Sequence, residues 1–255
     1  MDNTQLGSVI TEIKNKIAYI TFEHPSHNSL PSRLLTQLKD AITKSGEDSG
    51  VVLIVLQSSG ERTFCAGASF DELASIQDFQ SGKKFFLGFA NVINAIRKCP
   101  KIVIGRVQGK AIGGGVGLAS ACDYCFATEA ASIKLSELAV GIGPFVIGPA
   151  VQRKMRVSAF SQLALNATAF QSAAWAKERG LYHDIFPTIT EMDAGIATLS
   201  AQLLGSNPDA LRLLKKVFWE GTDNWDALLE ERAGMSGMLV LSDFTKNAIA
   251  AFKNA

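Results

Sequence analysis

The strongest constraint on the fold is an unbroken apolar run at residues 51–56, Val-Val-Leu-Ile-Val-Leu. A strand with one wet face alternates apolar and polar side chains, whereas a strand of a parallel sheet is covered on both faces and is apolar throughout. Two further segments with the composition of buried strands occur at 101–107 and 124–127. Segments with helical spacing alternate with these runs, at 34–42 and 79–98. The chain therefore predicts an α/β architecture.

The two ends of the chain differ from this middle part. Segments 10–13 and 17–22 favour strands, and Lys14-Asn15-Lys16 between them supplies the turn of a β-hairpin. After about Gly148 the strand patterns nearly vanish. Helical patterns follow, at 160–165, 173–179, 189–204, 210–219 and 225–241. We expect an α/β core over residues 1–195 and a helical region over residues 196–255.

Composition excludes several functional classes. The chain has 255 residues, is 47% hydrophobic and carries a net charge of +1, so a sizeable folded core is expected and long-range attraction of nucleic acid is not. No apolar stretch approaches the length of a membrane span, and the first residues do not resemble a secretory signal. Four cysteines in a chain of this size indicate reduced thiols and a cytoplasmic protein.

Two loops rich in small residues could carry chemistry. They are residues 64–70, Phe-Cys-Ala-Gly-Ala-Ser-Phe, at the end of a predicted loop over 58–68, and the glycine-rich residues 109–118. Glycine and alanine let a ligand approach the backbone closely, and free N–H groups at a helix start can stabilise a developing negative charge. Two such donors on one oxygen would form an oxyanion hole. Ordinary tight turns are the alternative.

Together these loops resemble the enoyl-CoA hydratase/isomerase (crotonase) superfamily. The resemblance covers nearly the whole chain and is specific through its combination of motifs. The motifs are Phe64-Cys65-Ala66-Gly67-Ala68, Gly109-x-Ala111-x-Gly113-Gly114-Gly115-x-x-Leu118 continuing to Cys122-Asp123, Leu135-Ser136-Glu137, His24-Pro25 with Asn28-Ser29-Leu30, and Ala176-x-x-x-Gly180-Leu181.

The resemblance implies a spiral of ββα units with a helical C-terminal region that mediates trimerisation, as a homotrimer or a hexamer made of two trimers. It also implies that the backbone N–H groups of Ala68 and Gly114 hold the thioester carbonyl of an acyl-coenzyme A. The residues implied to bind the substrate are Ala66, Gly67, Ala68, Ser69, Phe70, Gly113 and Gly114. No separate cofactor is expected, because coenzyme A is part of the substrate.

The chain departs from the family pattern at Gly117. Hydratases of the superfamily commonly carry one catalytic glutamate at this position and a second at the position of Glu137. Two carboxylates can divide the work of adding water, whereas one carboxylate can move a single proton between carbons. The segment Leu135-Ser136-Glu137-x-x-Val140-Gly141-x-x-Pro144-x-x-x-Gly148-Pro149 resembles the branch that includes bacterial methylglutaconyl-CoA hydratases, and that branch often has glycine at the position of Gly117. This resemblance favours a hydratase, with 3-methylglutaconyl-CoA as one candidate substrate. The alternative is an enoyl-CoA isomerase that uses Glu137 alone.

The setting of Glu137 and the remaining candidates lead to further expectations. The apolar neighbours of Glu137 in the sequence predict a raised pKa for its carboxyl.

Cys122 and Cys125 have C-x-x-C spacing without a second pair, which favours core packing over a zinc site. Asp123 is expected to be structural. The three histidines are too scattered for a metal site, so no metal is predicted. A serine peptidase using Ser69 and a non-catalytic acyl-CoA-binding or RNA-binding protein are weaker alternatives.

Overall fold

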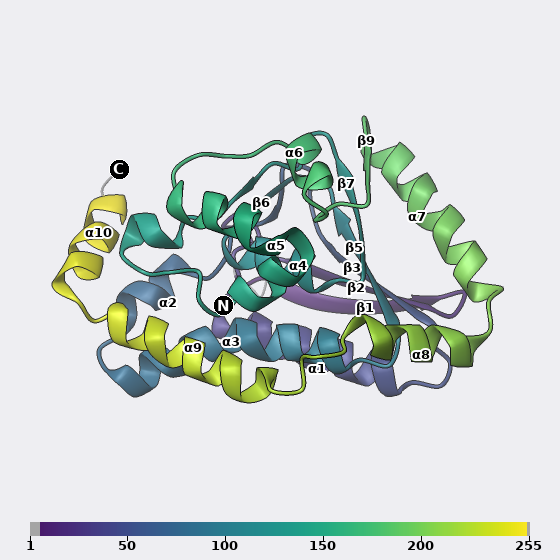
Figure 1. The fold of residues 1–255 in the computed structure, drawn as a ribbon, viewed down its shortest axis with the longest axis horizontal. Helices are drawn as coiled ribbons and strands as arrows, with labels where there is room; N and C mark the ends of the chain where they lie inside the picture. Colours follow the sequence, from purple (N-terminus) through teal and green to yellow (C-terminus); the bar gives the residue numbers. More distant parts are fainter. Residues whose placement is uncertain (1–5, 254–255) are drawn as a thin grey trace.

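The structure, a computed structural model, describes residues 6–253. Its main sheet has the strand order β1-β2-β3-β5-β7-β9 (Figure 1). The strands are β1 (Ser8–Lys14), β2 (Ile17–Glu23), β3 (Leu53–Ser58), β5 (Ile102–Val107), β7 (Tyr124–Thr128) and β9 (Asp184–Phe186). Strands β1 and β2 form the predicted hairpin, and every other pair in the sheet is parallel. The parallel sheet expected from residues 51–56 is therefore confirmed.

Helices cover both faces of this sheet. They are α1 (Ser32–Glu47), α2 (Phe70–Ser75), α3 (Phe79–Lys98), α4 (Gly114–Ala121), α5 (Gly148–Leu165), α6 (Ala173–Glu178), α7 (Ile189–Leu204), α8 (Pro208–Phe218), α9 (Trp225–Leu239) and α10 (Asp243–Lys253). On β3, Ile54 and Leu56 belong to the core shared with α1 and α3, whereas Leu53 and Val55 belong to a second core shared with α7 and α8. Burial on both faces explains the unbroken apolar run.

A second, three-stranded sheet has the order β4-β6-β8, with β4 (Thr63–Cys65), β6 (Lys110–Ile112) and β8 (Ile133–Lys134). All its strands are parallel. Strand β4 lies inside the segment 58–68 that the sequence predicted as a loop, so that prediction was wrong for these three residues. Strands of two or three residues are too short to show a period of two, and the neighbouring glycines and polar residues indicate turns.

The C-terminal third is helical, as expected, with strand β9 as an exception that the sequence did not predict. Helix α9 lies along α3 (Figure 1), and the two backbones touch where glycines face each other. A Cβ atom added at Gly237 would lie 2.6 Å from the Lys83 nitrogen, and one at Gly82 would lie 3.0 Å from the Gly237 oxygen. This close approach brings α9 over the helix that forms one wall of the site described below.

The structure does not test two predictions about the whole chain, the division into domains and the absence of a secretory signal. Helix α7 spans the expected division after residue 195, and the division into two domains stays a prediction. Residues 1–5, on which the absence of a secretory signal partly depended, lie outside the described residues. Within 6–253, no helix is both long enough and apolar enough to cross a membrane.

Candidate active site

The small parallel sheet brings three distant segments together at one edge. Parallel strands end on the same side of a sheet, and ligands of α/β proteins gather at such carboxyl edges. The pairs Cys65–Ala111 and Ile112–Lys134 lie in register, so the chain leaves β4, β6 and β8 side by side. The segments that follow are Ala66–Ala68, Gly113–Gly114 and Ser136–Glu137, and all of them line one pocket.

Two backbone N–H groups at this edge are free to hold an oxygen. Ala68 forms an isolated parallel bridge with Leu30, in which Leu30 N donates to Gly67 O at 2.8 Å and Ser69 N donates to Leu30 O at 3.3 Å. The Ala68 N–H therefore points away from Leu30. Gly114 is the first residue of α4, where backbone N–H groups have no intrahelical acceptor. Within residues 6–253, neither N–H donates to a protein acceptor.

The backbone requires glycine at both Gly113 and Gly114, in the glycine-rich loop between β6 and α4. Gly113 has φ 52° and ψ −117°, a conformation that side chains strongly disfavour. A Cβ atom there would lie 2.8 Å from Glu137 Oε1, and a Cβ atom at Gly114 would lie 2.3 Å from Phe89 Cε1. The triple glycine thus lets the Glu137 carboxylate and the Phe89 ring touch the backbone that carries the free N–H of Gly114.

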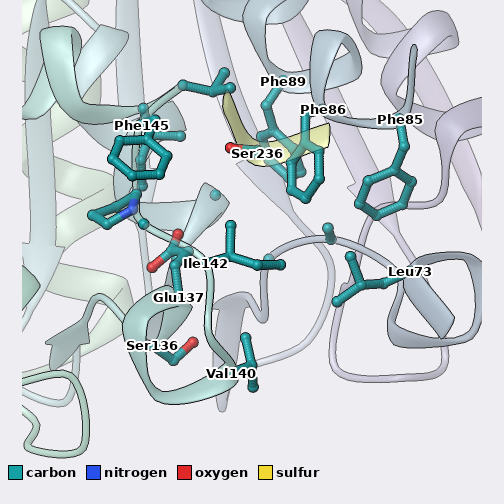
Figure 2. A pocket seen from close by; sticks show the side chains of 18 of the residues that line it. Leu73, Phe85, Phe86, Phe89, Ser136, Glu137, Val140, Ile142, Phe145 and Ser236 are labelled. Atoms are coloured by element: carbon teal, nitrogen blue, oxygen red, sulfur yellow. The ribbon is translucent and has the colours of Figure 1, made fainter. Parts of the chain in front are cut away.

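Glu137 begins a short 3₁₀ helix, η2 (Glu137–Val140), which is separated by two residues from the end of β8. Its Oε2 atom is buried and has no hydrogen-bond partner among the described residues. Burial raises the pKa of this carboxyl to about 7, and the residue's own backbone N–H opposes the shift. In Figure 2 the carboxylate points into the pocket toward the Phe145 ring. A carboxyl with a pKa near neutrality can both accept and donate a proton at physiological pH.

The rest of the pocket is apolar. Its wall of larger side chains comes from α2, α3 and the segment after Glu137 (Figure 2). These side chains are Phe70, Leu73, Phe85, Phe86, Phe89, Val140, Ile142, Pro144, Phe145, Val146 and Ile147. Among the described lining residues, Glu137 is the only one with an ionisable side chain, and Ser136 and Ser236 bring the only other polar side chains. The site therefore combines one acid/base group with two backbone donors.

The sequence profile of the enoyl-CoA hydratase/isomerase family matches residues 12–253 of the chain. The chain belongs to this family. This match confirms the resemblance stated from the motifs. The fold is confirmed by the crystal structure of an enoyl-CoA hydratase from Bacillus halodurans, which superposes with a TM-score of 0.88 at 24% identity. The superposition covers 95% of this chain and 99% of that one.

Relatives within the family have different reactions in their names. A short-chain-enoyl-CoA hydratase of Clostridium acetobutylicum is 27% identical over 97% of this chain and 95% of its own length. A peroxisomal Δ(3,5)-Δ(2,4)-dienoyl-CoA isomerase of Arabidopsis thaliana is 26% identical over 93% and 90%. The mitochondrial methylglutaconyl-CoA hydratase of Mus musculus is 31% identical over 77% and 63%. The chain is thus an enzyme of a family that contains both hydratases and isomerases.

Most residues expected to bind the substrate in this family enzyme lie in the pocket. Ala66, Gly67, Ala68, Phe70, Gly113 and Gly114 all line it. Ser69 is not among the lining residues: its Oγ accepts a hydrogen bond from Glu72 N at 3.4 Å and caps the start of α2. A hydroxyl in this role, with no histidine among the described lining residues, gives no support to the serine peptidase alternative.

The other candidates have structural surroundings. Cys122 and Cys125 are buried in the main core, as predicted. Asp123 is structural, as expected, since its carboxylate accepts from Val103 N at 2.8 Å and pairs with Lys215 Nζ at 2.6 Å. Among residues 6–253, no group of three or more His, Cys, Asp and Glu side chains could hold a metal ion.

Several lining residues had no signal in the sequence. Phe85, Phe86 and Phe89 lie on α3, and their spacing could have indicated an apolar face of this helix toward the pocket. Ser236 comes from α9, about 100 residues after Glu137, and only the packing of α9 on α3 brings it to the site. Neither motif nor periodicity predicts such a contact.

Proposed function

We propose that this family enzyme is an enoyl-CoA isomerase, which moves a double bond along the acyl chain of a coenzyme A thioester with Glu137 as its acid and base. One observation carries the proposal: among the described residues that line the pocket beside the two free N–H groups, a single one has an ionisable side chain, and the facing wall is apolar. A proton shuttle needs one such group, whereas the addition of water is helped by two. Of the two reactions expected from the sequence, the geometry favours this second one.

The reaction follows from these parts. The thioester oxygen accepts hydrogen bonds from the N–H groups of Ala68 and Gly114. The ionised Glu137 removes a proton from C2 of a 3-enoyl thioester, the C2–H bond breaks, and the electron pair delocalises over the thioester oxygen and C4. The positive end of α4 and the two donors stabilise this dienolate. The protonated Glu137 then delivers its proton to C4, which gives the 2-enoyl thioester and restores the carboxylate.

The lining also favours a class of acyl group. Among the described lining residues there is no Lys, Arg or His side chain, so a carboxylate on the acyl chain would be buried without a cation and close to Glu137. Burying an unpaired charge is strongly unfavourable. We therefore propose an uncharged acyl chain, straight or branched. The 3-methylglutaconyl group, with its free carboxylate, is a poorer fit than the sequence suggested.

Hydration is the second candidate. Relatives named as hydratases align with nearly the whole chain. A water molecule bound to Glu137 could add to C3 of a 2-enoyl thioester if the hydroxyl of Ser136 helped to orient it. Such a reaction would have to proceed without a carboxylate at Gly117.

A labelled-water experiment separates the two reactions. The purified protein is incubated with 3-enoyl-CoA and 2-enoyl-CoA esters, including 3-methylglutaconyl-CoA, in water enriched in ¹⁸O, and the products are analysed by mass spectrometry. We expect conversion of the uncharged 3-enoyl ester to the 2-enoyl ester without ¹⁸O. A labelled 3-hydroxyacyl-CoA as the main product would replace the isomerase by the hydratase.

The rate should depend on pH through Glu137. The carboxyl must be ionised in the free enzyme to accept the C2 proton, and its pKa is raised to about 7. We expect kcat/KM for isomerisation to increase about tenfold per pH unit below pH 7 and to level off above it. An initial-rate profile from pH 5 to 9 measures this. A plateau that extends down to pH 5 would contradict a base with a raised pKa.

We also propose that the chain assembles as a homotrimer or as a hexamer of two trimers. Helix α8 supports this with exposed apolar side chains on its outer side, Leu213, Leu214, Val217 and Phe218. Light scattering after gel filtration measures the mass, and a monomer at micromolar concentration would contradict the proposal.

A further inference from the structure

The Ile147 side chain fills the space that a side chain at position 117 would need. A Cβ atom added at Gly117 would lie 2.4 Å from Ile147 Cγ2 and 2.7 Å from Ile147 Cβ, both far inside van der Waals contact. Gly117 is buried within α4, and Ile147 is 4% exposed, caps the start of α5 and lines the active-site pocket. One residue of the pair can carry a side chain only if the other does not.

The place of this contact matters for chemistry. Gly117 follows Gly114 by three residues on α4, so the two positions face the same side of the helix, about 5–6 Å apart. Gly114 carries a free N–H, and the preceding Gly113 touches the Glu137 carboxylate. A side chain at 117 would therefore extend along the wall that Ile147 now forms. Gly117 itself does not line the pocket, whereas Ile147 does, so a carboxylate at 117 would reach the substrate only through the space that the Ile147 side chain fills.

We infer that Ile147 is the residue that restricts this site to one-carboxylate chemistry and thus determines the reaction specificity. This inference rests on the proposed isomerase function. Ile147 fills the volume of a second acid/base group and makes the wall apolar, so water is not held opposite Glu137. Position 117 lacks a carboxylate and position 147 carries a large side chain, and each of these features requires the other for the two helices to pack.

The distances define the variant that would open the site. In Ile147→Ala the Cβ atom would remain, 2.7 Å from a Cβ atom at 117, and the clash would persist. Only Ile147→Gly removes both close atoms, because the Ile147 Cα lies 3.7 Å from the added Cβ, which is an ordinary contact. Residue 147 has φ −84° and ψ −17°, a conformation that glycine adopts readily.

The double variant Gly117→Glu/Ile147→Gly is expected to add water to a 2-enoyl thioester. One carboxylate would accept a proton from water while the oxygen bonds to C3, and the other, protonated, would donate a proton to C2. The matched control is Gly117→Gln/Ile147→Gly, which has the same shape and cannot transfer a proton. We expect about 10²-fold more ¹⁸O-labelled 3-hydroxyacyl-CoA per unit time from the Glu variant than from the Gln variant. Equal rates would overturn the inference.

A double-mutant cycle in thermal stability tests the packing without any substrate. We expect Gly117→Ala to lower the Tm by about 5 °C or more, because a methyl group is forced into a filled space. In the Ile147→Gly background the same change should lower the Tm by less than about 2 °C. The matched control is Gly234→Ala, since a Cβ atom there would meet only Phe79 Cζ at 3.8 Å in the middle of helix α9. That variant should raise the Tm by a few degrees.

The two measurements keep this inference separate from the proposed function. Equal losses of Tm in both backgrounds would overturn the packing argument, whatever the reaction. If the unmodified enzyme already hydrates 2-enoyl esters as fast as the double variant, the isomerase proposal fails and so does the role of Ile147 in specificity, while coupling in the stability cycle would persist. Coupled stabilities with water addition confined to the Glu double variant would support the inference.

Discussion

Replacing Glu137 with Gln is expected to lower the isomerisation rate by about 10²–10⁴-fold, the usual contribution of a general acid/base group. The amide is nearly isosteric with the carboxyl, so the pocket and the two N–H donors should remain in place. The measurement is twofold: turnover of a 3-enoyl-CoA ester, and exchange of its C2 hydrogen in deuterated water. Both should fall together, while the affinity for a saturated acyl-CoA ester changes little.

The same substitution should make the protein more stable at high pH. The pKa of the Glu137 carboxyl is 4.5 as an unperturbed group and about 7 in the folded chain. A raised pKa means that the folded state holds its proton while the unfolded chain has lost it, so stability falls as pH rises from about 4.5 to about 7. Gln carries no such penalty. Because the residue is partly exposed, we expect a gain on the order of 2 kcal/mol at pH 8, which disappears at pH 4.

Glu129→Gln provides the control for both measurements, since Glu129 is exposed and lies outside the pocket. It should change neither turnover nor the pH dependence of unfolding. Turnover that survives in Glu137→Gln would remove Glu137 from the mechanism. If the stability difference between Glu137→Gln and the unmodified protein does not grow with pH, burial does not raise the pKa of the Glu137 carboxyl. An activity loss together with a stability gain distinguishes a catalytic group from a structural one.

The long elements of the fold could be predicted from the sequence because their hydrophobic patterns are long. Helix α3 spans 79–98, as its periodicity indicated, and the strand expected at 51–56 exists as β3 with a shift of two residues. The shortest elements could not be predicted. Strands β4, β6 and β8 have three, three and two residues, and they exist because they pair with one another and not because of their own composition. These are the strands that assemble the site.

For the site, the sequence predicted the groups but not their surroundings. The motifs indicated the donors at Ala68 and Gly114 and the acid/base group at Glu137. Apolar neighbours in the sequence correctly predicted the raised pKa of Glu137. The occupant of the space beside Gly117 could not be inferred, because Ile147 lies 30 residues further along the chain. Packing between segments that are distant in sequence has no local signature.

The largest effect on stability is expected from breaking a buried ion pair at the far end of α4. Asp123 and Lys215 are 2.6 Å apart, and each side chain is 3% exposed. The other carboxylate oxygen accepts from Trp219 Nε1 at 2.9 Å, so Asp123 holds α8 through two side chains. Asp123 follows directly after the C-cap residue of α4, the helix whose first residue offers a free N–H to the substrate. The pair thus connects the C-terminal helices to the element that carries the site.

Lys215→Met removes the ammonium group and keeps most of the apolar stem, which leaves the buried Asp123 carboxylate without its ion-pair partner, while Lys154 Nζ stays on the Asp123 backbone oxygen at 2.9 Å. We expect a loss of about 3–5 kcal/mol in the free energy of unfolding, measured by urea denaturation. The matched control is Lys216→Met, because Lys216 is the exposed neighbour on the same helix and should change stability by less than about 0.5 kcal/mol. Adding Asp123→Asn to Lys215→Met removes the unpaired charge and should restore part of the loss. A Lys215→Met variant as stable as Lys216→Met would mean that Val103 N–H, Trp219 Nε1–H and the nearby Lys154 stabilise the carboxylate without Lys215, and that α8 is held by its apolar contacts.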